Sequence, residues 1–513
     1  MSEYLRRLAA TGAAYTAASI LSKLIAVALL PLYTRYLAPA DYGAAEVLFA
    51  AVVAASIVVR LGVIEALLRF YYQADEDPDR VVATSFAALF WGASAGALLA
   101  LPFAAPLSEA LLDTRDPELM RIAIGGLWVL TLFEYLLTLF RLEERARAYF
   151  LTTIANVLVT IPVTVALVVG ADEGARGLLI GSYATGAAFV AFLLVLHRRR
   201  LSLAVDRALL GRLLRFGLPT MPAELSLYSL NFIDRVIIVR YAGLAEAGLY
   251  ALAVKFGQAV NVLVRGFQLA WPPLAYSIRD DDEARRAYAL IVTWFVTGCA
   301  FVVTGMWLLS RWIARALAAP EFFDSYEAVG LISTGVTLYA LYMVLVVILG
   351  RTGRTGFNFP ATAAATVVNV ALNLLLVPPL GIVGAGLALV ASYLVVLVMM
   401  YVFTQRLFAV PYEWGRLARV VLGSAALVGL GELLMPTSGL AGFAGRVGLW
   451  LAFPALLLAS GFLSAEERRS LSILLRPREL AVRVRELRER PPASQGSIPE
   501  VYEAEADDED RLR

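Results

Sequence analysis

Charged and amide side chains recur at helical spacing inside stretches of the chain that are otherwise apolar. Residues 227–243 read LYSLNFIDRVIIVRYAG, which places an asparagine, an aspartate and an arginine among apolar side chains. The residues that follow one another here at steps of three or four, and so share one face of a helix, are Thr220, Glu224, Tyr228, Asn231 and Arg235. Because a charge at membrane depth costs at least roughly 2.5–3.5 kcal/mol, we expect these groups to face a partner or a water-filled cavity.

Similar polar faces occur in other apolar stretches of both halves of the sequence. One further on carries Lys255, Gln258, Asn261, Arg265 and Gln268, and a later one carries Asn358, Thr362, Thr366, Asn369 and Asn373. Near the N-terminus the aligned residues are Gly12, Thr16, Ser19 and Lys23, followed in the next stretch by Glu46, Ser56 and Arg60. Several such faces in both halves predict one shared cavity.

The cations in these faces outnumber the acids that could neutralise them. Of the 44 basic residues only Lys23 and Lys255 are lysine, and both lie inside apolar stretches. We therefore predict a cationic cavity, and the residues assigned to it are Lys23, Arg60, Arg235, Lys255 and Arg265. Its substrate would carry negative charge, most simply a phosphate or pyrophosphate.

Two further sets of residues complete the predicted site. The polar side chains assigned to substrate binding are Tyr228, Asn231, Gln258, Asn261, Asn369 and Asn373. Glu224 and Asp234 are assigned to coupling or gating, and Glu134 is a candidate for a gate at the cytoplasmic end. The alternative interpretation is that these groups join helices to one another through hydrogen bonds and ion pairs, and the sequence leaves it open.

The elements that must position these residues are membrane-spanning helices. The chain has 513 residues, is 60% hydrophobic and 17% charged, and has a mean hydropathy of +0.73, which is typical of an all-α polytopic membrane protein. Since a span needs roughly 20 apolar residues, the sequence predicts about fourteen. They are centred near Ala26, Ala54, Ser94, Val129, Val159, Ala184, Asn231, Asn261, Val302, Ala340, Val368, Leu394, Ala426 and Pro454.

The distribution of arginine predicts the orientation. Alternate loops collect most of the arginines, above all the run HRRR at 197–200, and the positive-inside rule places those loops and both termini in the cytoplasm. We expect a multi-pass protein of the bacterial or archaeal cytoplasmic (inner) membrane. The first apolar run is longer than the apolar core of a signal peptide, so we interpret it as an uncleaved first helix.

An internal repeat predicts the domain organisation. The motif RYLAPADYG at 35–43 recurs as RYAGLAEAG at 240–248, and each copy joins the first span of its half to the second. This pattern indicates two parallel repeats, whose interface near the midplane is where transporters bind substrate. The predicted parts are an N-terminal lobe of six spans at 1–200, an inter-lobe loop at 201–215, a C-terminal lobe of six spans at 216–406, two accessory helices at 407–463, and a charged, partly disordered cytoplasmic tail at 464–513.

The motifs that an enzyme would need are not found. The sequence has no P-loop, no cluster of metal ligands and no paired carboxylates suited to acid and base catalysis, and its single histidine, His197, sits in an arginine run. We expect a protein that is not an enzyme, with no cofactor, no bound metal and no nucleic-acid partner.

Four stretches of the chain resemble a known family. They are SILSKLIAVALLPLYTRYLAPADYG at 19–43, ALLRFYY at 66–72, DRVIIVRYAGLAEAGLYALAVKFGQAVNVLVRGFQLAWPPLAYS at 234–277 and NVALNLLLVPPLGIVGAGLAL at 369–389. Together they resemble the polysaccharide transport family of oligosaccharide flippases, within the multidrug, oligosaccharidyl-lipid and polysaccharide exporter superfamily. The resemblance extends over nearly the whole chain to about Leu463 and is not specific to a substrate.

The resemblance implies a fold and a function. It implies two six-helix lobes around a central cavity, which moves a polyprenyl-diphosphate-linked glycan between membrane leaflets by alternating access, and two extra helices that form a groove for the lipid tail. By span and character, Lys23, Arg60 and either Lys255 or Arg265 are the counterparts of basic cavity residues in related lipid II flippases. The expected partners are the lipid-linked glycan, membrane lipids, and a polysaccharide polymerase or glycosyltransferase complex.

Three other functions fit the same residues. A cation-coupled multidrug antiporter of the same superfamily would favour a net acidic cavity, whereas the predicted cavity is net basic. Flipping of lipid II itself is compatible with the basic residues. A scaffold within an envelope polysaccharide complex, which transports nothing, would leave the two lysines without a function.

Overall fold

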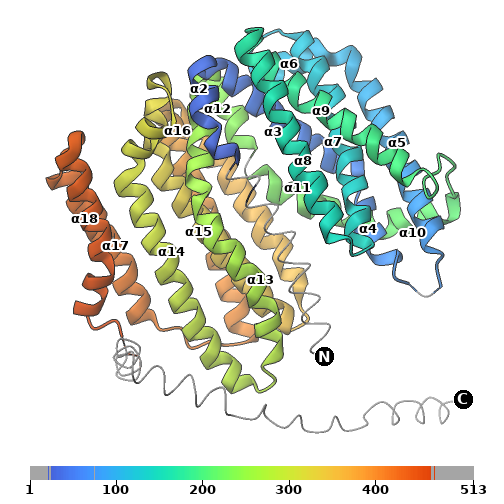
Figure 1. Ribbon diagram of the computed structural model, residues 1–513. Helices are drawn as coiled ribbons and strands as arrows, with labels where there is room; N and C mark the ends of the chain where they lie inside the picture. The colour runs from blue at the N-terminus through green and yellow to red at the C-terminus, as the bar shows by residue number, and fades with distance from the viewer. Residues whose placement is uncertain (1–20, 22–24, 74, 231, 464–466, 468–513) are drawn as a thin grey trace, which may run out of the picture. The chain divides into compact units, whose positions relative to one another are not determined.

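The chain folds as a set of long helices. The computed structural model describes residues 21, 25–73, 75–230, 232–463 and 467, and within these ranges the secondary structure is helical, with no strand (Figure 1). Eleven helical segments in this part of the chain are long and apolar enough to cross a membrane. The predicted all-α polytopic fold is thus confirmed. The predicted tail at 464–513 lies, apart from Glu467, outside the described residues.

The first half of the sequence contains helices that mostly begin at clear signals. They are α2 (Leu30–Tyr36), α3 (Pro39–Arg60), α4 (Val63–Phe70), α5 (Pro78–Ala100), α6 (Ala104–Leu112), α7 (Pro117–Leu142), α8 (Ala146–Val165) and α9 (Gly174–His197). Helices α3, α5 and α7 each start with proline, whose fixed φ suits the first helical turn. The side chains of Asp77 and Asp116 accept hydrogen bonds from the first free amides of α5 and α7.

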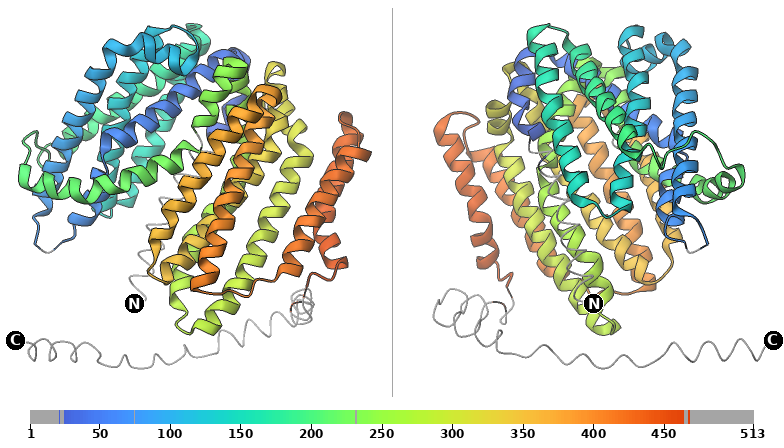
Figure 2. Two further views of the ribbon diagram at one scale, coloured as in Figure 1. Left: turned by 180° about the vertical axis from the view of Figure 1, so that it is seen from behind. Right: turned by 45° about the vertical axis from the view of Figure 1, so that its right-hand side comes forward.

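The second half begins after a short surface helix, α10 (Arg207–Gly217), which lies partly within the predicted inter-lobe loop. Its helices are α11 (Met221–Ser229), α12 (Ile233–Gly257), α13 (Asn261–Ser277), α14 (Asp281–Leu317), α15 (Tyr326–Arg351) and α16 (Asn358–Leu407), followed by the accessory helices α17 (Trp414–Leu434) and α18 (Gly439–Ala459). In the left view of Figure 2 helices α3 to α10 gather in one group and helices α12 to α16 in another.

Two glycines break helices, one of which is too long for a single crossing. Helix α16 has 50 residues, which at 1.5 Å per residue makes about 75 Å, far more than the roughly 30 Å hydrocarbon core. Its backbone is non-helical at Gly381 (φ 52°), and α12 is broken in the same way at Gly243 (φ 91°). Because positive φ strains any residue with a Cβ, these breaks depend on glycine. The first predicted span, near Ala26, is described only at residue 21 and from residue 25 onward.

The two halves meet mainly along α3 and α12, which pack against each other. We call the helix ends near residues 37–38, 113–116 and 243 the Gly243 side, and the ends near residues 143–145 and 198–206 the linker side. One cluster of buried apolar side chains continues from α3 into α12, α14 and α15. A second cluster, formed by α4, α5, α7, α9 and α10, lies on the linker side of the first half alone. The apolar core that the two halves share therefore lies mainly on the Gly243 side.

Candidate functional site

Glu46, in the first half of the sequence, forms ion pairs with two cations of the second half. It lies on α3, and its carboxylate is 2.5 Å from Nζ of Lys255 and 3.5 Å from Nη1 of Arg235, both on α12. Nη1 of Arg235 also donates to the backbone oxygen of Glu46 at 2.9 Å. Nζ of Lys255 lies 4.9 Å from the centre of the Tyr42 ring. Two predicted cavity cations are thus engaged by one carboxylate.

Arg60 is engaged in the same way at the other end of α3. Its guanidinium is 2.8 Å from Glu134 on α7 and 3.0 Å from Glu224 on α11, and its Nε donates to the backbone oxygen of Ser56 at 3.3 Å. Only 12% of the Arg60 side chain is exposed. Glu134, the predicted gate candidate, therefore shares Arg60 with Glu224, which crosses to the second half.

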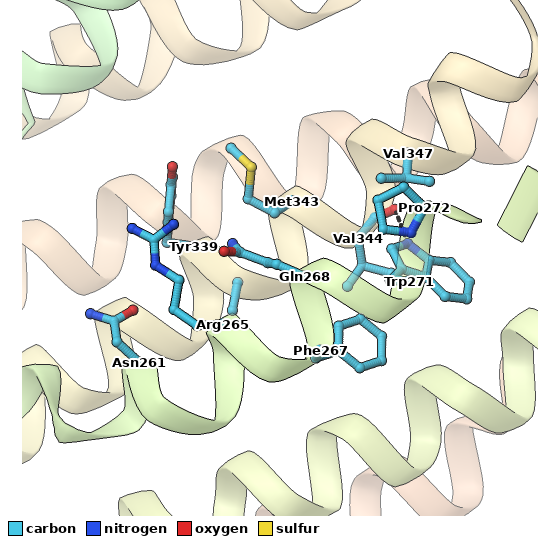
Figure 3. A pocket seen from close by; sticks show the side chains of 11 residues that line it. Asn261, Arg265, Phe267, Gln268, Trp271, Pro272, Tyr339, Met343, Val344 and Val347 are labelled. Atoms are coloured by element: carbon cyan, nitrogen blue, oxygen red, sulfur yellow. Dashed lines mark hydrogen bonds between the residues drawn. The ribbon is translucent and has the colours of Figure 1, made fainter. Parts of the chain in front are cut away.

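Arg265 lies in a cavity between α13 and α15 and has no acidic partner in the described part of the chain. The cavity has a volume of about 290 Å³. Figure 3 shows the Arg265 guanidinium beside Tyr339, with the amides of Asn261 and Gln268 flanking them. This end offers a fixed positive charge, two amides and a phenol. Charge-assisted hydrogen bonds to an anion, together with hydrogen bonds to hydroxyl groups, are the chemistry such a set performs.

The other end of the Arg265 cavity is apolar. Phe267, Trp271 and Pro272 line it from α13, and Met343, Val344 and Val347 line it from α15 (Figure 3). The indole N–H of Trp271 donates to the backbone oxygen of Val344 at 3.3 Å, which joins the two helices at the floor of the cavity. The cavity therefore accepts a ligand with a charged polar part next to an apolar part.

A second cavity is apolar throughout and involves the accessory helix α17. It measures about 260 Å³, and side chains of α14, α15, α16 and α17 line it. Val344 lines both cavities, so they lie on two sides of α15. A hydrocarbon chain is the ligand that such a wall favours.

Asp234 is buried away from both of these cavities. Its side chain is 1% exposed, and Oδ2 accepts a hydrogen bond from the Tyr250 hydroxyl at 2.5 Å. Its Oδ1 has no hydrogen-bond donor in the described structure. A buried carboxylate oxygen without a donor is costly, and it can be satisfied by taking up a proton or a small cation.

The remaining predicted residues take different positions. Asn369 and Asn373 on α16 are fully buried, with Nδ2 of Asn373 donating to the backbone oxygen of Asn369 at 2.9 Å. The Tyr228 hydroxyl donates to the backbone oxygen of Ala50 at 3.2 Å and so joins α11 to α3. Gln258 lies in the 3₁₀ turn Gln258–Val260 between α12 and α13. Lys23 and Asn231 lie outside the described residues.

The structure thus brings Asn261 and Arg265 together in one cavity, and it places Lys255, Arg235 and Arg60 in ion pairs. Tyr339 lines this cavity too, and it was not predicted because an isolated tyrosine in an apolar span has no spacing that distinguishes it. Within the described ranges, no group of three or more His, Cys, Asp or Glu side chains could hold a metal ion.

Solved structures share this fold. A lipid II flippase, MurJ, in an inward closed conformation matches with a TM-score of 0.68 and 12% identity over 88% of this chain and 99% of that chain. A MATE family multidrug resistance transporter of the MOP superfamily, in an inward-facing conformation, matches with a TM-score of 0.63 and 16% identity over 78% and 96%. A MOP superfamily transporter from Pyrococcus furiosus with a binding pocket of reversed polarity matches with a TM-score of 0.56 and 16% identity over 81% and 95%.

The family follows from the sequence itself. No curated protein matches the chain. The model of one family, described as polysaccharide biosynthesis protein, matches residues 8–278, which is more than half of the sequence. This match includes the first copy of the repeat motif, the second copy and both ion-paired ends of α3. The chain therefore belongs to the polysaccharide biosynthesis protein family, within the fold of the MOP superfamily of transporters.

Proposed function

We propose that the protein is a flippase that moves a polyprenyl-diphosphate-linked oligosaccharide across the cytoplasmic membrane by alternating access. The observation that carries the proposal is the guanidinium of Arg265, which has no acidic partner among the described residues and lies in a cavity lined by amides, a phenol and aromatic side chains. Arg265 is exposed to this cavity, and a cation at membrane depth without an acid in the described structure calls for an anionic ligand. A diphosphate supplies the anion, and the sugars beside it supply hydroxyls for Asn261, Gln268 and Tyr339.

The lipid part of the substrate fits the surroundings of this cavity. The prenyl chain is apolar and stays in the hydrocarbon phase, and the apolar cavity beside α17 is lined for such a chain. Both termini would lie in the cytoplasm, as the arginine bias indicates. The linker side then faces the cytoplasm, where the lipid-linked glycan is made, and the Gly243 side faces outward, toward a polymerase that would receive it.

Arg60 gives the substrate a means of opening the linker side. Its ion pair with Glu224 joins the two halves, and its ion pair with Glu134 does not. A diphosphate competes with carboxylates for a guanidinium, because both anions accept two parallel hydrogen bonds from it. Substrate arrival would displace Glu224, and the carboxylate of Asp234 would couple the cycle to a proton or cation gradient.

The test is transport in proteoliposomes. We expect wild-type protein to move a fluorescent polyprenyl-diphosphate oligosaccharide, and Arg265→Ala to move it more slowly by about tenfold to a hundredfold, since a hydrogen bond to a charged group contributes about 1.5–3 kcal/mol. Arg121→Ala, which removes an exposed arginine of α7, is the matched control. Equal rates for Arg265→Ala and wild type would refute the assigned anion site.

Two other substrates are tested in the same vesicles. Lipid II is a prenyl diphosphate as well, and the likeness in fold to a lipid II flippase makes it the first competitor. A cationic drug exchanged for protons or sodium is the second, favoured by the buried carboxylate of Asp234. Transport of lipid II alone would change the assigned glycan, whereas drug exchange without any lipid transport would replace the flippase by an antiporter.

A further inference from the structure

The two copies of the repeat motif touch each other through their backbones. A Cβ placed on Gly43 of α3 would lie 2.0 Å from the backbone oxygen of Leu244. A Cβ placed on Gly248 of α12 would lie 2.1 Å from the backbone oxygen of Pro39. Real Cβ atoms essentially never come within 3.0 Å of such an atom. Both positions therefore require glycine as long as the two helices stay this close.

The contact is reciprocal. Pro39 and Leu244 hold the same place in the two copies of the motif, and so do Gly43 and Gly248. Each glycine receives the carbonyl that lies four residues before the other glycine, and the two glycine backbones face each other. A symmetric contact of this kind marks the place where the axis relating the two repeats passes between α3 and α12.

Other contacts hold the same side closed. Arg240 is paired with Asp113, the backbone N–H of Ala319 donates to Oγ1 of Thr34 at 3.0 Å, and the rings of Tyr42 and Phe322 meet edge to face. All of these join the first half to the second on the Gly243 side. Among them the glycine contact differs physically, because it involves two backbones and no side chain that could rotate away.

We propose that Gly43 and Gly248 form a two-glycine lock that closes the Gly243 side of the transport path and separates when that side opens. This inference rests on the proposed alternating-access function and concerns its conformational cycle. In the closed state each glycine leaves room for the backbone carbonyl of the opposite helix. In the open state the helix ends are apart, and a methyl group at either position meets no carbonyl. Alanine at either position therefore excludes the closed state and leaves the open state available.

The experiment measures the distance across the Gly243 side. Spin labels at Thr114 and Glu321, two exposed positions on opposite halves, report opening by pulsed electron resonance, with the buried Cys299 replaced by alanine. We expect Gly43→Ala and Gly248→Ala each to shift the population to longer distances. Gly429→Ala is the matched control, because an added Cβ there meets nothing within 4 Å, and it should keep the wild-type distances.

The readout separates this inference from the proposed function. If the lock is right and the substrate is wrong, the distances shift although the oligosaccharide is not moved. If the variants fold with wild-type distances, the lock is refuted, even where wild-type protein transports the oligosaccharide.

A second measurement covers variants that fail to fold. Cysteines at Ala40 and Leu244, which line one cavity on the Gly243 side, are joined in otherwise wild-type protein by a short bifunctional thiol reagent that can be cleaved. Cross-linking should stop transport and cleavage should restore it. Undiminished transport by fully cross-linked protein would overturn the lock.

Discussion

Glu46 is the carboxylate shared by two cations of the other half, so its removal should cost more than the loss of a surface ion pair. Glu46→Gln leaves Lys255 and Arg235 without their acid. Breaking a buried pair costs about 3–5 kcal/mol, and the 31% exposure of the Lys255 side chain places the expected loss at the lower end of that range. The midpoint of thermal unfolding in detergent measures it.

The control for Glu46 is an exposed glutamate. Glu118 is 3.0 Å from Arg176 and its side chain is 64% exposed, so Glu118→Gln should cost less than about 1 kcal/mol. The double variant Glu46→Gln/Lys255→Gln should recover part of the loss, since one orphaned cation is gone. A Glu46→Gln protein as stable as Glu118→Gln would show that Glu46 does not hold the two halves together.

Asp234 should matter for energy coupling and not for binding. Asp234→Asn preserves the size of the side chain, but removes the negative charge that takes up a proton or cation. We expect the variant to exchange substrate between leaflets at equilibrium and to lose the acceleration by an imposed proton or sodium gradient. Tyr250→Phe, which removes the hydroxyl donor and keeps the carboxylate, should still respond. A gradient response of Asp234→Asn equal to wild type would contradict the assignment.

The spacing of residues predicted which side chains share one face of a helix, but it could not predict which residues pair across two helices. Asn261 and Arg265 were expected on one helical face, and they line one cavity. Lys255 was expected in a cationic cavity, yet its partner Glu46 comes from a helix in the other half, which spacing within one helix cannot reveal. Tyr339 depends in the same way on the packing of α15 against α13. The net charge of a site is therefore known only after the helices are placed.

Charged side chains hold helix α10 in place near its first turn. Asp206 caps it, and Arg80 and Arg212 form ion pairs with Asp206 and Glu76. The hydrogen bond from the Leu209 amide and the ion pair with Arg80 hold the pKa of Asp206 below its ordinary value. A carboxylate whose pKa is lower in the folded state stabilises the fold above its unfolded pKa, and this contribution is lost as the pH falls through the folded value.

Acidification should therefore destabilise α10 at a higher pH than the membrane-spanning helices. We expect faster amide hydrogen exchange in residues 207–217 once the pH falls below about 4, the ordinary range of an aspartate, after correction for the intrinsic rates. Asp206→Asn retains a good capping side chain and lacks the charge, so exchange in this variant should not depend on this titration. Wild-type exchange that follows the Asn variant at every pH would contradict the role of Asp206.

The helix breaks could be predicted from the sequence only as boundaries between spans. Separate spans were expected around Val368 and Leu394, and Gly381 divides them. The surface helix α10 was assigned to a loop, because eleven residues with three arginines carry too weak an apolar pattern to be recognised as a span. Its buried Leu209 and Leu213 pack on α4 and α5, contacts that its own sequence does not specify.

At the level of the whole molecule, a nine-residue motif predicts a repeat, and its two copies meet at Gly43 and Gly248. The family resemblance is confirmed by the match over residues 8–278. The two sides of the membrane differ in the kind of contact that joins the halves. The Gly243 side has a backbone contact and a shared apolar core, whereas the linker side has the ion pair of Arg60 with Glu224.

These two contacts should act on one conformational equilibrium in opposite directions. Glu224→Gln weakens the link on the linker side, and Gly248→Ala prevents closure of the Gly243 side. The Glu224 side chain is 40% exposed, so its ion pair should contribute about 0.2–1 kcal/mol, or up to about fivefold in population. Because the two residues share no partner, their effects on the equilibrium should add.

The double variant Glu224→Gln/Gly248→Ala should consequently show spin-label distances between those of Gly248→Ala and wild type. It should also transport faster than Gly248→Ala alone, because a flippase that must visit both states is slowed by a strong bias toward either. The label pair at Thr114 and Glu321 reads the first effect, and flipping in proteoliposomes reads the second. If the double variant matches Gly248→Ala in both measurements, the two sides open independently, and rigid rocking of the two halves about α3 and α12 is refuted.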